Sequence, residues 1–313
     1  MPTKFAIIAA TILSCVGTSH RTLVAQSGSR DALPLQLFVY DRSAPLDISA
    51  RVYQQRDDMT IYDISYVSPK GGRVPGYLTV PTAPGPHAGI LIQHGLPGSR
   101  EDMFRLLTTL ARTGAVTLAI TAPWARPEIA STRDTILAMT PRDAEEQIQL
   151  VIDWMRGVDL LRARLDVDPE RLAYVGVSYG GMIGGLLAGV ERRVKAYVLI
   201  VGDGGLATHM KQGDNPDWAR LTQPQRDAWL AAMEPIEPIR FIPYAAPAVL
   251  LLQNGRRDEQ IPMENALTYQ QAASNPKWIY WYDTGHTLNS QSRFDMTNWL
   301  AMWIGLNPAR LQP

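Results

Sequence analysis

The stretch Gly176-Val-Ser178-Tyr-Gly180-Gly181 decides the fold that this sequence predicts. It follows the apolar run Leu172–Val177, which has the length of a buried strand, and it opens a small-residue segment typical of a helix. A serine in the pattern G-x-S-x-G at a strand–turn–helix junction sits on a strained turn with its Oγ raised above the sheet. Glycines are needed at positions 176 and 180 because neighbouring backbone comes too close for side chains. The junction predicts a nucleophilic Ser178; an incidental serine in a glycine-rich turn is the alternative.

Short apolar runs alternate with longer helical patterns from residue 61 onward. The eight predicted strands are Ile61–Val67, Gly76–Val80, Gly89–Gln93, Val116–Thr121, Leu172–Val177, Ala196–Val201, Ala248–Gln253 and Trp278–Tyr282. The predicted helices are 100–112, 141–163, 179–191, 217–232, 263–273 and 291–304. Several strands are continuous apolar runs, which are typical of a parallel sheet covered by helices on both faces. The alternation predicts an α/β fold with a mostly parallel eight-stranded sheet flanked by helices.

The chain length of 313 residues suits one large domain of this kind. Its first two strands are joined by Ser68-Pro-Lys-Gly-Gly-Arg73, which is too short for a helix, so we expect an antiparallel hairpin at the sheet edge. We interpret residues 203–247 as a small cap insertion with one helix. The predicted organisation is an N-terminal arm at 26–57 and a domain at 58–313.

The N-terminus has the pattern of an export signal. Lys4 is followed by the apolar run Phe5–Leu13, which is too short to span a membrane. We expect residues 1–25 to be a cleaved signal peptide and the protein to be secreted or periplasmic. Ile12-Leu-Ser-Cys15 is similar to a lipoprotein processing box, so a lipid anchor at Cys15 is the alternative, and a buried N-terminal element is the third. Because Cys15 is the only cysteine, cleavage would leave none, which suits an oxidising compartment.

The composition argues against several function classes. Hydrophobic residues make up 46% and charged residues 19%, which is not the composition of a disordered chain. Basic and acidic residues both number 30 and form no like-charge block, so no nucleic-acid partner is expected. One cysteine, no H-E-x-x-H motif and no histidine cluster leave no basis for a metal site. We therefore expect no metal and no cofactor.

A serine nucleophile needs a general base, and two histidines follow Ser178. In folds with this elbow the chain order is Ser, then Asp or Glu, then His. His286 follows the last predicted strand directly, where a loop at the carboxyl edge of the sheet would deliver it. His209 comes too soon after Ser178 to leave room for the acid. We predict that His286 is the base; a surface loop histidine is the alternative.

The orienting acid has two candidates that each follow a predicted strand. Asp258 lies just past the strand Ala248–Gln253, and Asp203 follows the preceding strand. Asp283 is too near His286 in sequence to lie on its far side. We predict Asp258 as the acid, with Asp203 as the alternative.

An oxyanion needs two preorganised N–H donors, one of which we expect from Tyr179, the residue after the nucleophile. The other should come from the loop His94-Gly-Leu-Pro-Gly98. The proline of this loop has no N–H, which leaves Gly95 or Leu96, and we prefer Leu96. His94 precedes the serine, so we expect it to brace the loop by hydrogen bonds.

Three tryptophans are candidates for the substrate pocket. Trp124 follows the strand Val116–Thr121, and Trp218 and Trp229 lie in the predicted cap. Plain core packing is an equally good interpretation for each of them.

A rival motif is Gly202-Asp-Gly204-Gly-Leu-Ala207, which formally matches a dinucleotide-binding fingerprint. The genuine fingerprint usually starts the first βαβ unit, whereas this copy follows the sixth predicted strand. Asn215-Pro216 also interrupts the helix that the fingerprint requires, so the match is not adopted.

The four spaced motifs resemble those of the α/β-hydrolase superfamily over residues 58–305. Within it, the chain is most similar to secreted relatives of dienelactone hydrolase and of the prolyl-oligopeptidase catalytic domain, a group that includes acetyl-esterase-type enzymes. The stretches that carry the resemblance are Ile64-Ser-Tyr-Val-Ser-Pro-Lys-Gly-Gly-Arg-Val-Pro-Gly-Tyr77, His94-Gly-Leu-Pro-Gly98 and Gln253-Asn-Gly255 with Asp258.

The resemblance implies a serine esterase that acts on a small-molecule ester through an acyl-enzyme, with no cofactor. Dienelactone hydrolases use a cysteine nucleophile, where this elbow carries Ser178. Prolyl oligopeptidases carry a propeller before the catalytic domain, whereas only residues 26–57 would precede the core here. Both departures favour an esterase. A serine peptidase or amidase is the alternative, and a non-catalytic binding protein on the same scaffold is a remote one.

Overall fold

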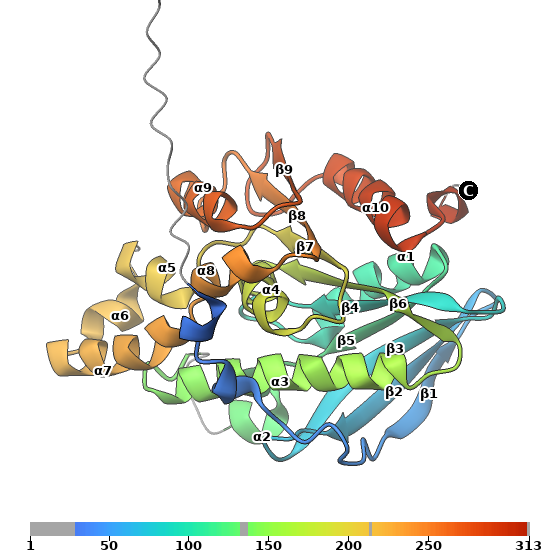
Figure 1. Ribbon diagram of the computed structural model, residues 1–313, viewed down its shortest axis with the longest axis horizontal. Helices are drawn as coiled ribbons and strands as arrows, with labels where there is room; N and C mark the ends of the chain where they lie inside the picture. Colours follow the sequence, from blue (N-terminus) through green and yellow to red (C-terminus); the bar gives the residue numbers. More distant parts are fainter. Residues whose placement is uncertain (1–28, 132–136, 213–214, 312–313) are drawn as a thin grey trace, which may run out of the picture.

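The computed structural model describes residues 29–131, 137–212 and 215–311. In these residues nine strands form one sheet in the order β1-β2-β3-β5-β4-β6-β7-β8-β9, with helices on both faces (Figure 1). The strands are β1 (Ser49–Gln55), β2 (Met59–Val67), β3 (Arg73–Pro81), β4 (His87–Gln93), β5 (Ala115–Ile120), β6 (Val167–Val177), β7 (Ala196–Ile200), β8 (Val249–Gly255) and β9 (Lys277–Tyr282). The predicted signal peptide at 1–25, with Cys15, lies outside the described residues.

Ten α-helices and seven short 3₁₀ helices connect the strands of the described chain. The α-helices are α1 (Phe104–Arg112), α2 (Pro127–Ala130), α3 (Arg142–Arg162), α4 (Tyr179–Val190), α5 (Leu206–Gln212), α6 (Pro216–Arg220), α7 (Gln223–Met233), α8 (Pro238–Phe241), α9 (Met263–Ala272) and α10 (Ser290–Ile304). The 3₁₀ helices are η1 (Arg30–Ala32), η2 (Leu35–Phe38), η3 (Arg100–Met103), η4 (Pro123–Ala125), η5 (Glu234–Ile236), η6 (Ile242–Tyr244) and η7 (Pro308–Leu311). None of these described helices is long and apolar enough to cross a membrane.

Six of the strands form a parallel block, and the first three form an antiparallel edge. β5, β4, β6, β7, β8 and β9 pair in parallel, whereas β1, β2 and β3 pair antiparallel and β3 joins the block through an antiparallel pairing with β5. The hairpin between β2 and β3 closes with Val67 opposite Arg73, so the predicted antiparallel hairpin is confirmed. Its predicted place at the sheet edge is wrong, because β1 pairs with β2 and is itself the edge strand. The predicted α/β fold with a mostly parallel sheet is confirmed as well.

The sheet has one strand more than the eight that the sequence predicted. The additional strand, β1, lies within residues 26–57, which were predicted to be an arm, and pairs with β2 at the sheet edge. All seven residues of β1 are exposed. A strand without a buried face has no alternation of apolar and polar residues, so the pattern that identified the other strands is missing here.

The predicted cap at 203–247 contains four α-helices in its described part, α5 to α8, and not the single helix that was expected. Pro216, Pro224 and Pro238 each stand at the first or second position of a helix. Proline favours that position because its N–H would have no partner there and its φ is already helical. The prolines therefore begin the cap helices, which divides the predicted helix 217–232 into α6 and α7.

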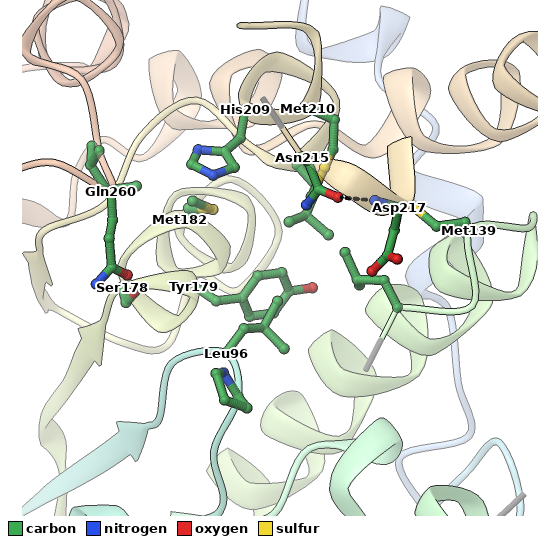
Figure 2. Close-up of a pocket in the computed structure, with 14 residues that line it drawn as sticks. Leu96, Met139, Ser178, Tyr179, Met182, His209, Met210, Asn215, Asp217 and Gln260 are labelled. Carbon is green, nitrogen blue, oxygen red and sulfur yellow. Dashed lines mark hydrogen bonds between the residues drawn. The ribbon is translucent and has the colours of Figure 1, made fainter. Parts of the chain in front are cut away.

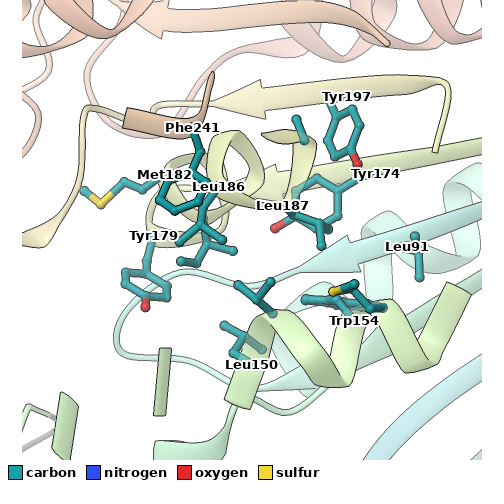
Figure 3. Packing of buried hydrophobic residues seen from close by; sticks show 14 of the residues in the cluster. Leu91, Leu150, Trp154, Tyr174, Tyr179, Met182, Leu186, Leu187, Tyr197 and Phe241 are labelled. Carbon is teal, nitrogen blue, oxygen red and sulfur yellow. The ribbon is translucent and has the colours of Figure 1, made fainter. Parts of the chain in front are cut away.

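The parallel strands bury side chains on both faces, which explains their continuous apolar runs. On β4, Ile90 and Ile92 pack on the face covered by α1 and α10, whereas Leu91 packs on the opposite face with residues of α3 and α4. Figure 3 shows this second layer, in which Trp154 of α3 lies near Tyr174 of β6, with their ring centroids 6.0 Å apart. The two layers hold the carboxyl ends of the strands in fixed positions, and the candidate site is built there.

A buried ion pair attaches the loop after β5 to α3. Arg126 Nη2 donates to Asp153 Oδ2 at 2.5 Å, and the two side chains are 2% and 0% exposed. Ser68 Oγ donates to the other carboxylate oxygen at 2.5 Å. Arg126 Nε also donates to the carbonyl oxygen of Thr121 at 3.2 Å. The pair therefore fixes the backbone that carries η4.

We expect Asp153→Ala to lower the free energy of unfolding by about 3–5 kcal/mol, because Arg126 would remain buried without its counter-ion. Urea unfolding followed by circular dichroism measures this loss. Glu234→Ala is the matched control, since its ion pair with Lys211 is half exposed, and it should cost below about 1 kcal/mol. Equal losses in the two variants would contradict a stabilising role for the buried pair.

Candidate active site

Ser178 occupies a strained turn between β6 and α4. Its φ is +56°, in the left-handed region that side chains other than glycine rarely adopt. A Cβ at Gly176 would lie 2.0 Å from the carbonyl oxygen of Gly180, and a Cβ at Gly180 would lie 2.5 Å from that of Gln93. No side chain fits at either position, which agrees with the glycine requirement inferred from the sequence.

The structure brings Ser178, His286 and Asp258 together in one hydrogen-bonded row. His286 Nε2 lies 2.9 Å from Ser178 Oγ, and His286 Nδ1 lies 2.8 Å and 3.0 Å from the two oxygens of Asp258. Asp258 is in the loop from β8 to α9, and His286 is in the loop from β9 to α10. An imidazole that donates Nδ1–H to a carboxylate presents the lone pair of Nε2 to the hydroxyl, so this row can accept the hydroxyl proton.

Asp258 is held as a carboxylate although its side chain is only 1% exposed. Burial acts to raise its pKa, but the hydrogen bonds from His286 and from the backbone N–H groups of Ile261 and Gln260 lower the pKa below its ordinary value. The carboxyl group consequently takes up its proton at a lower pH than a free aspartate does.

Asp203, the alternative acid, does not reach His286 by any hydrogen bond in the described chain. It is fully buried and pairs with His209, whose Nδ1 lies 3.2 Å from Asp203 Oδ2. The two candidate acids therefore each have a histidine of their own.

The loop after β4 lies against Ser178. A Cβ at Gly95 would come within 2.9 Å of Ser178 Cβ. His94 braces this loop, as expected, because its Nδ1 lies 2.8 Å from the carbonyl oxygen of Gly95 and its Nε2 accepts a hydrogen bond from the N–H of Ala122 at 3.1 Å. Burial lowers the pKa of His94, which favours the neutral ring that this bonding needs.

Two backbone donors beside Ser178 are free for a ligand. Among the described residues, no protein atom accepts a hydrogen bond from the N–H of Leu96 or of Tyr179. Tyr179 is also the first residue of α4, where the helix dipole favours negative charge. Both N–H groups can therefore serve a developing oxyanion.

A cavity of ≈ 440 Å³ opens at Ser178 (Figure 2). Its lining residues are Leu96, Pro97, Leu137, Met139, Ser178, Tyr179, Met182, Leu206, His209, Met210, Asn215, Asp217, Gln260 and Ile261. The motifs could have suggested some of them, since Met182 lies one helical turn beyond Ser178 and Gln260 and Ile261 follow Asp258. The residues from α5 and α6 carried no such signal and were missed.

The three candidate pocket tryptophans are not among the residues that line this cavity. Trp124 packs behind it, with its ring centroid 4.9 Å from that of Tyr179. Trp229 is fully buried and donates to Asp143 at 2.8 Å, and Trp218 packs on Trp229 at 5.4 Å. The structure therefore does not place these tryptophans in the wall of this cavity. They pack against other residues, which is the other interpretation that the sequence allowed.

Comparison with solved structures identifies the α/β-hydrolase fold. Acetyl xylan esterase from Paenibacillus sp. R4 is 20% identical, with a TM-score of 0.73 over 86% of this chain and 91% of that chain. Acetyl xylan esterase 1 from Thermoanaerobacterium sp. JW/SL YS485 is 17% identical, with a TM-score of 0.70 over 85% and 91%. A putative dienelactone hydrolase from Klebsiella pneumoniae subsp. pneumoniae MGH 78578 is 20% identical, with a TM-score of 0.57 over 79% and 99%. No curated protein matches the sequence significantly.

A sequence family matches the part of the chain that carries the site. The model of the prolyl oligopeptidase family covers residues 145–303, from α3 to α10. This range is just over half of the chain and includes Ser178, Asp258 and His286. The chain belongs to the prolyl oligopeptidase family.

Proposed function

We propose that this protein is a serine hydrolase that cleaves carboxylic esters through an acyl-enzyme. The observation that carries the proposal is the hydrogen-bonded row of Ser178, His286 and Asp258 at the wall of an open cavity. A hydroxyl, an imidazole and a buried carboxylate in this order form the set of groups that acyl transfer requires.

In the first half of the reaction, Ser178 Oγ attacks the ester carbonyl while His286 Nε2 takes the hydroxyl proton. Negative charge develops on the carbonyl oxygen, where the N–H groups of Leu96 and Tyr179 are the proposed donors. Asp258 stabilises the protonated imidazole and keeps it in position. When the tetrahedral intermediate collapses, the bond to the alcohol oxygen breaks and His286 returns the proton to the leaving alcohol.

In the second half, a water molecule takes the place of the alcohol. His286 removes a proton from the water as the hydroxide oxygen attacks the acyl carbonyl. Collapse then breaks the bond to Ser178 Oγ, and the proton on His286 returns to the serine. The products are a carboxylic acid and an alcohol, and water is the only co-reactant.

Two findings support a small ester as the substrate. The solved structures of similar fold include proteins named acetyl xylan esterase and dienelactone hydrolase, which supports an ester substrate. The cavity of ≈ 440 Å³ has a size suited to a small molecule. The family match supports a second candidate, a serine peptidase or amidase, because the family takes its name from an oligopeptidase.

Matched esters and amides test the preference. We expect kcat/KM for p-nitrophenyl acetate and butanoate to exceed that for the corresponding p-nitroanilides by at least about 10³-fold. The physical reason is that p-nitroaniline is a far poorer leaving group than p-nitrophenol. Aminoacyl p-nitroanilides complete the panel. Cleavage of an aminoacyl anilide as efficient as that of the esters would assign the peptidase or amidase function instead.

A further inference from the structure

A second Asp–His pair faces the cavity that contains Ser178. His209 of α5 lines this cavity, and its Nδ1 lies 3.2 Å from Asp203 Oδ2. In Figure 2 the His209 ring lies beside Met182, on the cap side of the cavity. The proposed reaction uses neither residue of this pair.

The pair is built to hold the imidazole in one orientation. Asp203 is fully buried, and its oxygens also accept hydrogen bonds from the N–H of Gly205 at 3.2 Å and from Asn265 Nδ2 at 3.4 Å. These contacts fix the carboxylate, which in turn fixes Nδ1 of His209. The other nitrogen, Nε2, has no hydrogen-bond partner among the described residues, and the side chain remains 30% exposed.

The helix that carries His209, α5, is held by hydrogen bonds to Glu237 at the other end of the cap. Glu237 accepts hydrogen bonds from the N–H groups of Ala207 and Thr208 at 2.9 Å and 3.0 Å, and from Thr208 Oγ1 at 3.0 Å. Burial raises the pKa of Glu237 to about 7, against the effect of these bonds. A side chain held from its own helix and from a buried carboxylate is preorganised for a ligand.

We propose that His209 is a substrate-binding residue, whose Nε2–H donates a hydrogen bond to a neutral carbonyl or hydroxyl oxygen outside the scissile ester group. This inference rests on the proposed esterase function and assigns a substrate class to it, namely small esters that carry a second, uncharged oxygen function. Apolar side chains such as those of Leu137, Met182 and Leu206 form much of the remaining wall, and His209 shares the polar part of the wall with residues such as Asn215 and Gln260.

The charges around His209 favour a neutral oxygen over a carboxylate. The hydrogen bond to Asp203 raises the pKa of His209, so the protonated ring with its Nε2–H persists to a higher pH than in a free histidine. Asp258 also acts on the ring as a negative charge, and Glu237 does so at pH values above its raised pKa of about 7. Asp217 lines the same cavity, with its ion pair to the largely exposed Arg220 at 3.3 Å. A carboxylate on the substrate would meet these negative charges.

Matched substrates test the inference with the whole protein. In one pair, p-nitrophenyl pentanoate and p-nitrophenyl 4-oxopentanoate differ by a carbonyl in the acyl part. In the other pair, propyl acetate and 2-hydroxyethyl acetate differ only in that a hydroxyl replaces the terminal methyl of the alcohol part. We expect wild-type kcat/KM to favour the oxygenated ester of at least one pair. His209→Leu should lower that ratio about tenfold or more, since a charge-assisted hydrogen bond is lost.

His209→Gln should restore most of the ratio, because its amide keeps an N–H donor at a similar reach. The wild-type ratio should fall as the pH rises through the pKa of His209, since Nε2 then loses its hydrogen, and the ratio of His209→Gln should not. A ratio within a pair cancels the titration of groups that act on both esters. Lys211→Ala, on the exposed side of the same helix, is the matched control and should keep the wild-type ratio.

Four results would overturn the inference. The first is that the wild type prefers the oxygenated ester in neither pair, and the second is that His209→Leu leaves the ratio of kcat/KM values unchanged. The third is that His209→Gln loses the ratio as fully as His209→Leu does. The fourth is that p-nitrophenyl hemiglutarate, an ester with a free carboxylate, is hydrolysed faster than p-nitrophenyl 4-oxopentanoate. These outcomes leave the proposed esterase standing. A protein that hydrolyses neither p-nitrophenyl pentanoate nor propyl acetate would instead reject the proposed function and this inference together.

Discussion

Ser178→Ala should lower kcat for ester hydrolysis by a factor on the order of 10⁵–10⁶, the loss expected when the nucleophile of such a row is removed. Without Oγ no acyl-enzyme forms, and the imidazole has no hydroxyl to deprotonate. The residual rate would come from the two backbone donors and from substrate binding, which together retain about 10³–10⁴-fold over the reaction in water.

Steady-state kinetics with p-nitrophenyl butanoate measure this loss, and circular dichroism checks that the fold is kept. A fluorophosphonate supplies a second readout, because serine attack forms an Oγ–P bond and releases fluoride. The mass of the tryptic peptide around residue 178 should increase in the wild type and stay unchanged in Ser178→Ala. Ser43→Ala, which alters an exposed hydroxyl that donates to Asp41, should behave like the wild type. Wild-type turnover by Ser178→Ala would reject the mechanism.

The elements that the sequence predicted well are those whose signals are local. The strand before Ser178 and the glycines around it are adjacent in the chain, so one short pattern contains the whole geometric requirement. His286 and Asp258 are distant from Ser178, but each comes shortly after a strand of the parallel block. Because parallel strands end at the same edge of a sheet, residues just past several strands meet there.

The elements that the sequence did not predict depend on contacts between distant segments. Three of the four described cap helices, α6, α7 and α8, have a proline at their first or second position. The cap also buries Trp229 against α3, where Asp143 accepts its N–H. Proline-rich sequence is equally compatible with irregular loop, so the number of helices could not be read from it. The strand β1 was missed because all of its residues are exposed, so its sequence lacks the apolar pattern that identifies a buried strand.

His209 shows the limit of chain-order reasoning. His209 follows Ser178 too soon in the chain to be the base, and the structure indeed places His286, not His209, at Ser178. The order of residues along the chain contains no sign that α5 places His209 at the cavity or that Asp203 holds it. Both facts come from how the cap packs over the sheet, which no short motif specifies.

Asp258→Asn should reduce kcat by about 10³–10⁴-fold, because an asparagine can face His286 with an N–H donor and so favour the wrong tautomer. The neutral amide would also no longer stabilise the imidazolium that forms during attack. Asp203→Asn should cost at most about tenfold on a simple apolar ester, since Asp203 contacts His209 and has no bond to His286.

The comparison of these two variants is informative because both carboxylates are buried, each beside a histidine. A general effect of removing a buried charge would therefore lower the two activities to a similar degree. Only a specific role at His286 separates them, and kcat for p-nitrophenyl butanoate, measured with unfolding curves for both proteins, provides the test. A greater loss for Asp203→Asn would move the acid to the loop after β7, and the hydrogen bonds of Asp258 to His286 would then be structural.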